Sequence, residues 1–139
     1  DYAHKNGLGI VAISAKIEEE IVELPPEEQR EYRQALGVDR SALERLITTA
    51  YSMLDLITYY TITTQLQAWT IKHGTTAQKA SGIIHSDFEK GFIRAEVFHY
   101  DDLMNYKSLH AIKEHGLLRS EGRDYIVHDG DIIHFLFSV

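Results

Sequence analysis

The first third of the chain places a short apolar run ahead of segments with helical periodicity. Residues Leu8–Ile13 (LGIVAI) are apolar or glycine throughout, which predicts a strand buried on both faces. Such a strand needs partners on both edges, and no neighbouring run supplies a parallel sheet. We therefore interpret it as the last strand of a domain whose remainder lies outside this chain.

Two helices are predicted after this run. Pro25 and Pro26, followed by two glutamates, suit the start of the first helix, and Gly37 ends it. Ser41 and Glu44 have the spacing of a capping box for the second helix. The apolar stripe of the second helix consists of Leu43, Leu46, Ile47, Ala50, Tyr51 and Leu54. We expect the two helices to pack as a hairpin.

From Thr58 onward the pattern changes to β-branched and aromatic residues, which predicts a domain boundary near Asp55, with domains at 1–55 and 56–139. Residues 61–63 and 68–71 are predicted to form a hairpin. A helix capped by Thr75 or Thr76 follows and ends at Gly91. The residues expected on its buried face are Ala77, Ala80, Ile83, Ile84 and Phe88.

The remaining pattern predicts a strand over 92–100, a short helix starting at Asp101, and a closing hairpin of residues 125–127 and 132–137. This order predicts an α+β fold in which one principal helix crosses a mixed sheet, that is, a ubiquitin-like β-grasp. The aromatic residues expected in its core are Trp69, Phe92, Phe135 and Phe137.

Composition narrows the function classes. The 139 residues carry a net charge of −7 and no cysteine, which argues against a strongly basic nucleic-acid surface and excludes disulfides and thiolate chemistry. No apolar stretch approaches the roughly 18 residues of a membrane span. The chain opens at Asp1 without a visible signal peptide, so we interpret it as a fragment of a cytoplasmic protein and expect no DNA partner.

Two stretches carry a family resemblance. Residues 68–97 (AWTIKHGTTAQKASGIIHSDFEKGFIRAEV) and 122–139 (GRDYIVHDGDIIHFLFSV) resemble the C-terminal TGS domain of YchF-type, Obg-related P-loop ATPases. Upstream, residues 13–18 (ISAKIE) resemble the last nucleotide-site motif of that family. The resemblance implies a TGS domain preceded by a helical connection and a remnant of the nucleotide-binding domain.

The resemblance also implies partners. Ser14, Ala15 and Lys16 would form the loop that touches the nucleotide base, and ATP or GTP with Mg²⁺ would bind only in the intact protein, together with the missing P-loop domain. Ribosome or RNA association is the implied role. A threonyl-tRNA synthetase or a stringent-response enzyme could also carry such a module, but the Ser-Ala-Lys segment disfavours both.

No residues in the sequence predict catalysis by this chain. It contains no G-x-x-x-x-G-K-[ST] loop to hold phosphates. His85, Ser86 and Asp87 contain the residue types of a hydrolytic triad, but adjacent residues diverge, so we expect helix-end hydrogen bonding instead. His128, Asp129, Asp131 and His134 could suggest a metal, yet a polar turn explains the aspartates, and we expect no metal site.

Five cationic residues lie closest in sequence to the predicted helix and its flanking strands: Lys72, His73, Lys79, Lys90 and Arg94. They could converge on phosphate and bind RNA or the ribosome, or be solvated surface charge. The alternative function is a ubiquitin-like protein-interaction or intramolecular control module without nucleic-acid binding.

Overall fold

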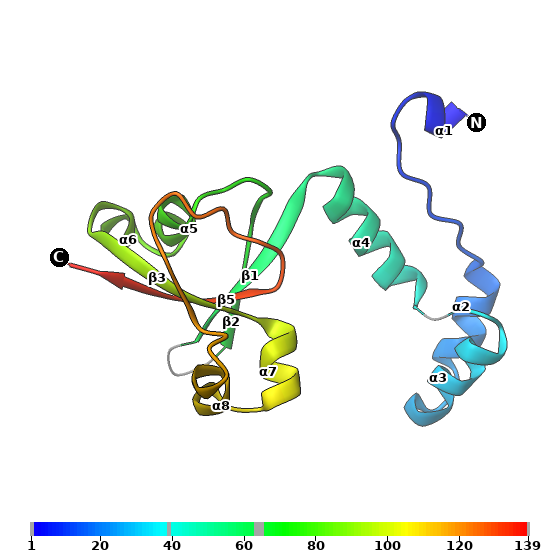
Figure 1. Ribbon diagram of the computed structural model, residues 1–139. Coiled ribbons are helices and arrows are strands. Elements are labelled where there is room, and N and C mark those ends of the chain that lie inside the picture. The colour runs from blue at the N-terminus through cyan, green and yellow to red at the C-terminus, as the bar shows by residue number, and fades with distance from the viewer. Residues whose placement is uncertain (1, 39, 63–65, 139) are drawn as a thin grey trace. The chain divides into compact units, whose positions relative to one another are not determined.

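The computed structural model describes residues 2–38, 40–62 and 66–138. Within it the chain forms two compact units, Asp1–Leu54 and Asp55–Val139 (Figure 1). The first unit contains helices only, and the second combines a five-stranded sheet with short helices. The mixed α and β content predicted from the sequence is thereby confirmed.

The first unit contains four helices: α1 (Tyr2–Lys5), α2 (Ala15–Val22), α3 (Pro26–Ala35) and α4 (Ala42–Met53). Pro25 occupies the N-cap position of α3, Pro26 is its first residue and two glutamates occupy its first turn, as expected from the sequence. The capping box of α4 is formed, because Ser41 Oγ accepts from the Glu44 amide and the Glu44 carboxylate accepts from the Ser41 amide. Gly37, at φ +70°, follows α3 in the left-handed region that glycine adopts readily.

The predicted strand at Leu8–Ile13 is wrong for this chain, since residues 8–14 have no regular secondary structure. The physical reason is that a strand depends on hydrogen bonds to a neighbour, and the described residues of the first unit supply no other strand. The apolar side chains of Leu8, Ile10 and Ile13 are exposed.

The stripe of α4 also differs from expectation. Leu43, Leu46 and Ile47 expose 65, 50 and 49% of their surface, so the preceding helix does not bury them. Helix α3 instead contacts α2, where Arg33 pairs with Glu18 at 3.2 Å.

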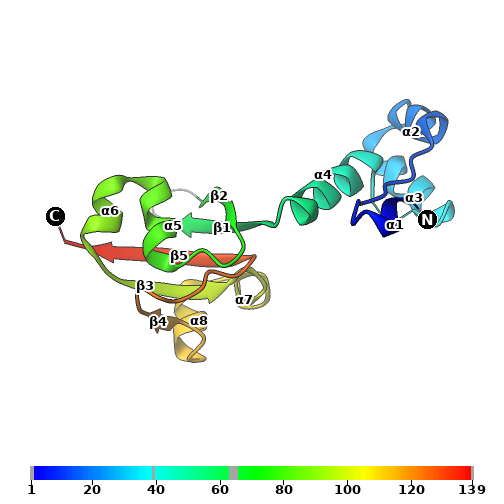
Figure 2. The same ribbon diagram turned by 90° about the horizontal axis from the view of Figure 1, so that it is seen from above.

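The sheet of the second unit has the strand order β2-β1-β5-β3-β4. Its strands are β1 (Leu56–Ile62), β2 (Leu66–Lys72), β3 (Phe92–His99), β4 (Arg119–Glu121) and β5 (Asp131–Phe137). Strand β1 runs parallel to β5, and the other neighbouring pairs are antiparallel. Figure 2 shows β2 and β4 at opposite edges. The first hairpin was predicted; of its residues, Thr63 lies outside the described part of the chain.

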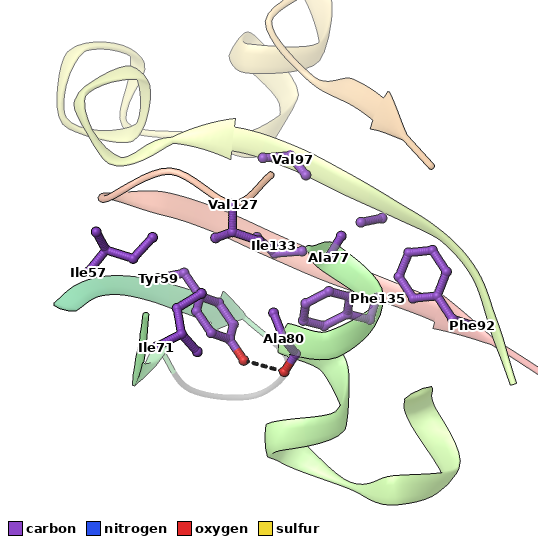
Figure 3. Close-up of a cluster of buried hydrophobic side chains, with 11 residues drawn as sticks. Ile57, Tyr59, Ile71, Ala77, Ala80, Phe92, Val97, Val127, Ile133 and Phe135 are labelled. Carbon is purple, nitrogen blue, oxygen red and sulfur yellow. Dashed lines mark hydrogen bonds between the residues drawn. The ribbon is translucent and has the colours of Figure 1, made fainter. Parts of the chain in front are cut away.

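Helices α5 (Ala77–Ile84) and α6 (Ser86–Lys90) lie on one side of this sheet, and α7 (Tyr100–Tyr106) and α8 (Leu109–Glu114) lie on the other (Figure 1). The larger core fills the space beneath α5. It contains Ile57, Tyr59, Ile71, Ala77, Ala80, Phe92, Ala95, Val97, Val127, Ile133 and Phe135 (Figure 3). The Tyr59 hydroxyl donates to the Ala80 carbonyl at 2.8 Å, which ties β1 to α5 within this core.

A smaller core joins the opposite face of the sheet to α7 and α8. Phe98, Ile112 and Ile132 are buried there, with Tyr60 and Leu103 packed against them. The strands therefore carry buried residues on both faces over part of their length, as Val97 and Phe98 on β3 illustrate. Of the expected core aromatics, Phe92 and Phe135 are buried, whereas Trp69 and Phe137 are half-buried at the margin.

Two further elements differ from prediction. The helix expected to run from Thr76 to Gly91 is broken at His85, whose backbone is extended (φ −160°, ψ 140°), and Ile83 is exposed rather than part of the buried face. The closing hairpin is wrong, since residues 125–127 make only an isolated bridge between Ile126 and Thr76. Strand β5 pairs with β1 and β3 instead, and tertiary contacts therefore decide its partners.

Candidate functional site

The segment predicted to touch a nucleotide base forms the start of α2. Ser14 is the N-cap, with its hydroxyl accepting from the Ile17 amide at 3.4 Å, and Ala15 and Lys16 are the first helical residues. All three are exposed. The segment has the geometry of an ordinary helix cap with exposed side chains.

Glu18, one turn further on, connects three helices. Its Oε2 atom pairs with Arg33 on α3, and its Oε1 atom accepts from the Ala42 amide at the start of α4 at 2.9 Å. A carboxylate at the first turn of a helix also complements the helix dipole. Glu18 therefore fixes the arrangement of α2, α3 and the start of α4 around the Ser14–Lys16 segment.

The five cationic residues do not form one patch. Lys79 lies on α5 and Lys90 ends α6, and these two helices lie on the same side of the sheet. The two helices are linked, since Gln78 Nε2 donates to the Glu89 carbonyl at 3.0 Å. Lys79 and Lys90 therefore belong to two linked helices on the same side of the sheet.

Lys72 and Arg94 belong to the opposite face. Their strand neighbours Ile71 and Ala95 point into the core beneath α5, and side chains alternate along a strand. Two strands, β1 and β5, separate β2 from β3, and the register places Lys72 beside Leu56 at the start of β1 and Arg94 beside Leu136 near the end of β5, so the two cations lie near opposite ends of the sheet. Arg94 also pairs with Glu96 at 3.4 Å, and His73 follows β2 in an exposed turn.

The face of the sheet that carries α7 and α8 has an apolar pocket of about 130 Å³. Its lining includes Ile62, Leu103, Leu109 and Leu118. Glu96 and His134 add polar groups to it, with Glu96 Oε2 and His134 Nδ1 3.8 Å apart. Sequence reasoning missed this pocket, because its walls come from separate segments that share no local pattern.

The His-Ser-Asp tripeptide has the structural role expected for it. His85 is the N-cap of α6, and its Nδ1 atom accepts from the Asp87 amide at 3.2 Å. The same arrangement recurs at α7, where His99 Nδ1 accepts from the Asp101 amide. Both histidines therefore end a non-helical segment and begin a helix.

The aspartates considered as metal ligands hold loops in place. Asp129 Oδ1 accepts from the Thr58 amide at 2.7 Å. Asp131 exposes 1% of its surface, and its Oδ2 atom accepts from both the Tyr125 hydroxyl and the His128 amide at 2.8 Å. Within the described residues, no three acidic or histidine side chains gather as a metal-binding group.

Asp131 is the centre of a polar network that sequence reasoning missed. Arg119 on β4 lies 3.6 Å from its Oδ1 atom and donates to the Tyr125 hydroxyl at 3.1 Å. Burial, together with the hydrogen bond to Asp131, raises the pKa of Tyr125 to about 12. The only sequence signal for this network was an aspartate directly before an apolar strand. Its partners could not be predicted, because they belong to preceding segments without hydrophobic periodicity.

The described residues thus define an α+β region in which a mixed five-stranded sheet carries helices on both faces. None of the described helices has the length and apolar character needed to cross a membrane. The chain belongs to the YchF-GTPase family, since residues 56–138 match the family model YchF-GTPase_C, described as a protein of unknown function.

Relatives extend the match over the whole chain. It is 49% identical over 140 residues to the "Ribosome-binding ATPase YchF" of Pasteurella multocida and 46% identical over 140 residues to that of Bacillus subtilis. All of this chain is covered in both comparisons, but only 39% and 38% of the relatives. The chain therefore spans well under half the length of the curated relatives it matches.

Solved structures agree with this assignment. The Schizosaccharomyces pombe YchF GTPase superposes with a TM-score of 0.78 at 37% identity, covering 94% of this chain and 34% of that protein. A GTP-binding protein from Pyrococcus horikoshii shares the fold, with a TM-score of 0.64 at 18% identity over 99% of this chain and 40% of that one.

Proposed function

We propose that this chain is the C-terminal regulatory and docking region of a translation-associated P-loop ATPase, and that its sheet unit is a TGS module that contacts the ribosome or its RNA. Membership of the YchF-GTPase family, together with relatives named ribosome-binding ATPases, is the observation that carries this proposal. The proposed location is the cytoplasm, where ribosomes are found.

The architecture of the second unit supports the β-grasp assignment. An N-terminal hairpin is followed by a helix that crosses the sheet, and the last strand returns to the centre, parallel to the first. The order of elements after residue 56 is the one predicted for this fold, apart from the position of β4. We accordingly assign residues 56–139 to the TGS domain and residues 1–55 to the region that adjoins the nucleotide domain.

The first unit is proposed to complete a nucleotide domain supplied elsewhere in the parent protein. Leu43, Leu46 and Ile47 on α4 and the apolar side chains of Leu8 and Ile10 are all exposed, which is the surface that a partner domain would cover. In that assembly Ser14, Ala15 and Lys16 would lie beside the base of ATP or GTP. The bound nucleotide and Mg²⁺ would provide the phosphoryl-transfer chemistry, and this chain would contribute orientation only.

Docking to ribosomal RNA would depend on exposed cations, and the fold divides the candidates into two sets. Lys79 and Lys90, the helical pair, lie on the side of the sheet that carries α5 and α6, whereas Lys72 and Arg94 lie on the side that carries α7 and α8. The helical pair is the stronger candidate, because Arg94 is already paired with Glu96. Each phosphate contact that is lost should reduce the salt dependence of binding by about one unit of slope.

Ribosome co-sedimentation of the 139-residue chain at low and moderate salt tests this proposal. The double variant Lys79→Glu/Lys90→Glu should lose salt-sensitive binding, and Lys72→Glu/Arg94→Glu should retain most of it. A third double variant, Lys107→Glu/Lys113→Glu, changes the net charge by the same amount at the end of α7 and on α8, and serves as the control. Equal losses in all three would indicate a general charge effect without a docking face.

Absence of ribosome binding by the folded chain would contradict autonomous docking. The function left in that case is the ubiquitin-like alternative, in which the module contacts protein or controls the nucleotide domain within the same polypeptide. Nucleotide hydrolysis by the parent protein with and without residues 56–139 would then be the deciding measurement.

A further inference from the structure

Strand β2 is the long edge strand of the sheet. It is the terminal strand, and among the described strands its one neighbour is β1. The opposite edge, β4, is only three residues long and carries Arg119 and Glu121. Short, charged edge strands are protected against further pairing, so β2 is the edge that can accept another strand.

The register shows which backbone groups face outward. The His73 amide donates to the Asp55 carbonyl at 2.9 Å, and these residues continue the β1–β2 register as a hydrogen-bonded pair. Hydrogen-bonded pairs alternate along an antiparallel ladder, so Gln67, Trp69 and Ile71 bond to β1. The amide and carbonyl groups of Leu66 and Ala68 therefore point away from the sheet.

The sequence of β2 (LQAWTIK) lacks the features that usually block an edge. It contains neither proline nor an acidic residue, its single charge is Lys72 at the end, and the β1–β2 register is continuous without a bulge. A continuous edge whose one charge lies at its end is a template for main-chain pairing.

A groove lies beside this edge, on the side of the sheet that carries α5 and α6. Its volume is about 240 Å³, and Gln67 and Trp69 of β2 line it together with Ile84, Phe88 and Phe137. The aromatic rings of Phe88 and Phe137 stack at 3.9 Å and form one wall. A strand added to β2 would direct alternate side chains toward Gln67 and Trp69, and thus toward this groove.

We propose that the edge of β2 binds an extended peptide of a partner protein by strand addition, with a large apolar side chain of the peptide in the groove beside Trp69. Main-chain hydrogen bonds would supply affinity and the groove would supply specificity. The outward amide and carbonyl groups of Leu66 and Ala68 can form hydrogen bonds with the backbone of another polypeptide strand. The described groove lining holds no lysine or arginine, so its chemistry favours a peptide over RNA.

Amide hydrogen exchange measured by NMR on the 139-residue chain tests this pairing at single residues. In the free protein the Ala68 amide should exchange fast and the Trp69 amide slowly. The probes are synthetic peptides in which threonine alternates with valine, leucine or phenylalanine, and a threonine–serine peptide is the control. Binding by strand addition should slow exchange at Ala68 by about tenfold or more, without a comparable change at Ile93.

The variant Ala68→Pro removes the outward amide while sparing the bonds to β1, because proline is tolerated on the free side of an edge strand. It should abolish peptide binding, whereas Ala68→Ser should retain it. Trp69 is the only tryptophan in the chain, so its fluorescence reports occupancy of the groove. If the proline variant misfolds, Phe88→Ala should still weaken peptide binding. The exchange measurement at Ala68 uses the unaltered chain, so it tests the proposal without any variant.

Several outcomes would overturn the proposal. One is that no apolar peptide protects the Ala68 amide from exchange. Another is that Ala68→Pro still binds the peptides. Protection of Ala68 that rises with protein concentration alone would assign the edge to a second copy of this chain. Protection by an oligouridine probe instead of peptides would assign it to RNA.

Discussion

Asp131 in the second unit is a buried carboxylate that exposes 1% of its surface and therefore needs hydrogen-bond partners. Two hydrogen bonds of 2.8 Å and the guanidinium of Arg119 compensate for its burial. Since the bonds reach back to Tyr125 and His128, this one side chain holds the irregular segment that precedes β5. A buried charge with this many partners is costly to alter, because removing it leaves several donors unpaired.

The variant Asp131→Asn should destabilise the second unit by about 1.5–3 kcal/mol, the typical value for hydrogen bonds to a charged group. Chemical denaturation followed by the fluorescence of Trp69 measures the loss. Asp124→Asn, at an exposed position in the same segment, is the matched control and should have little effect. Equal stability of the two variants would show that the network contributes nothing.

The titration of Tyr125 gives a second prediction at this scale. Burial and the bond to Asp131 raise its pKa to about 12, so the folded state holds the phenol proton more tightly than the unfolded state, where the pKa is about 10. Stability from this group should be complete below pH 10 and fall as pH rises toward 12. Tyrosinate absorbance of the wild type minus that of Tyr125→Phe should isolate this late transition; a midpoint near 10 would contradict it.

At the scale of elements, the ends of strands are fixed by close backbone approaches. Gly91 separates α6 from β3, and a Cβ atom there would collide with the carbonyl of Ser138 just beyond β5. The Ser138 amide donates to the Gly91 carbonyl at 2.9 Å, so the two backbones are locked together. Gly91 was expected from the sequence only as a helix stop, and its second role depends on a residue 47 positions later.

Gly91→Ala should therefore destabilise the second unit by about 1–3 kcal/mol, since backbone atoms must shift to admit the methyl group. Gly122→Ala is the matched control, because nothing lies within 4 Å of the position that the added methyl group would take and its φ is not positive. Thermal unfolding by circular dichroism separates the two variants. Similar midpoints would indicate that the ends of β3 and β5 move apart freely.

Helix starts were the elements that could be predicted best. The proline at the start of α3, the capping box of α4 and the Thr76 cap of α5 all depend on residues within one turn of each other. Their spacing in the sequence is also their spacing in the structure. The strand at Leu8–Ile13 and the hairpin at 125–137 were wrong because strands need partners, and the pattern of a single segment does not identify them.

At the scale of the whole molecule, the two units differ in how well they cover their apolar surface. Both buried clusters consist of residues from 57 to 135, within the second unit. In the first unit the fully buried apolar side chain of Ile21 contrasts with exposed Leu43, Leu46 and Ile47. The second unit therefore has the cores required of an independent domain, and the first offers a surface for a partner.

Residues 55–139 expressed alone should consequently fold with nearly the stability that this unit has in the whole chain, within about 0.5 kcal/mol, as expected for a change distant from the cores. Urea denaturation followed by Trp69 fluorescence compares the two proteins. A fluorescent dye that binds exposed apolar surface should bind the whole chain more strongly than residues 55–139. A large loss of stability on truncation would show that the first unit supports the sheet.

The sequence by itself determined the mixed α and β content, the helix starts, the first hairpin and the family, because these depend on residues close together or on the pattern of the whole chain. Tertiary structure alone decided that β5 lies between β1 and β3, that Asp131 gathers Arg119 and Tyr125, and that four of the five candidate cations divide between two faces of the sheet. The physical reason is that strand pairing, burial of charge and the shape of a surface all arise between segments far apart in sequence, where no local periodicity records them.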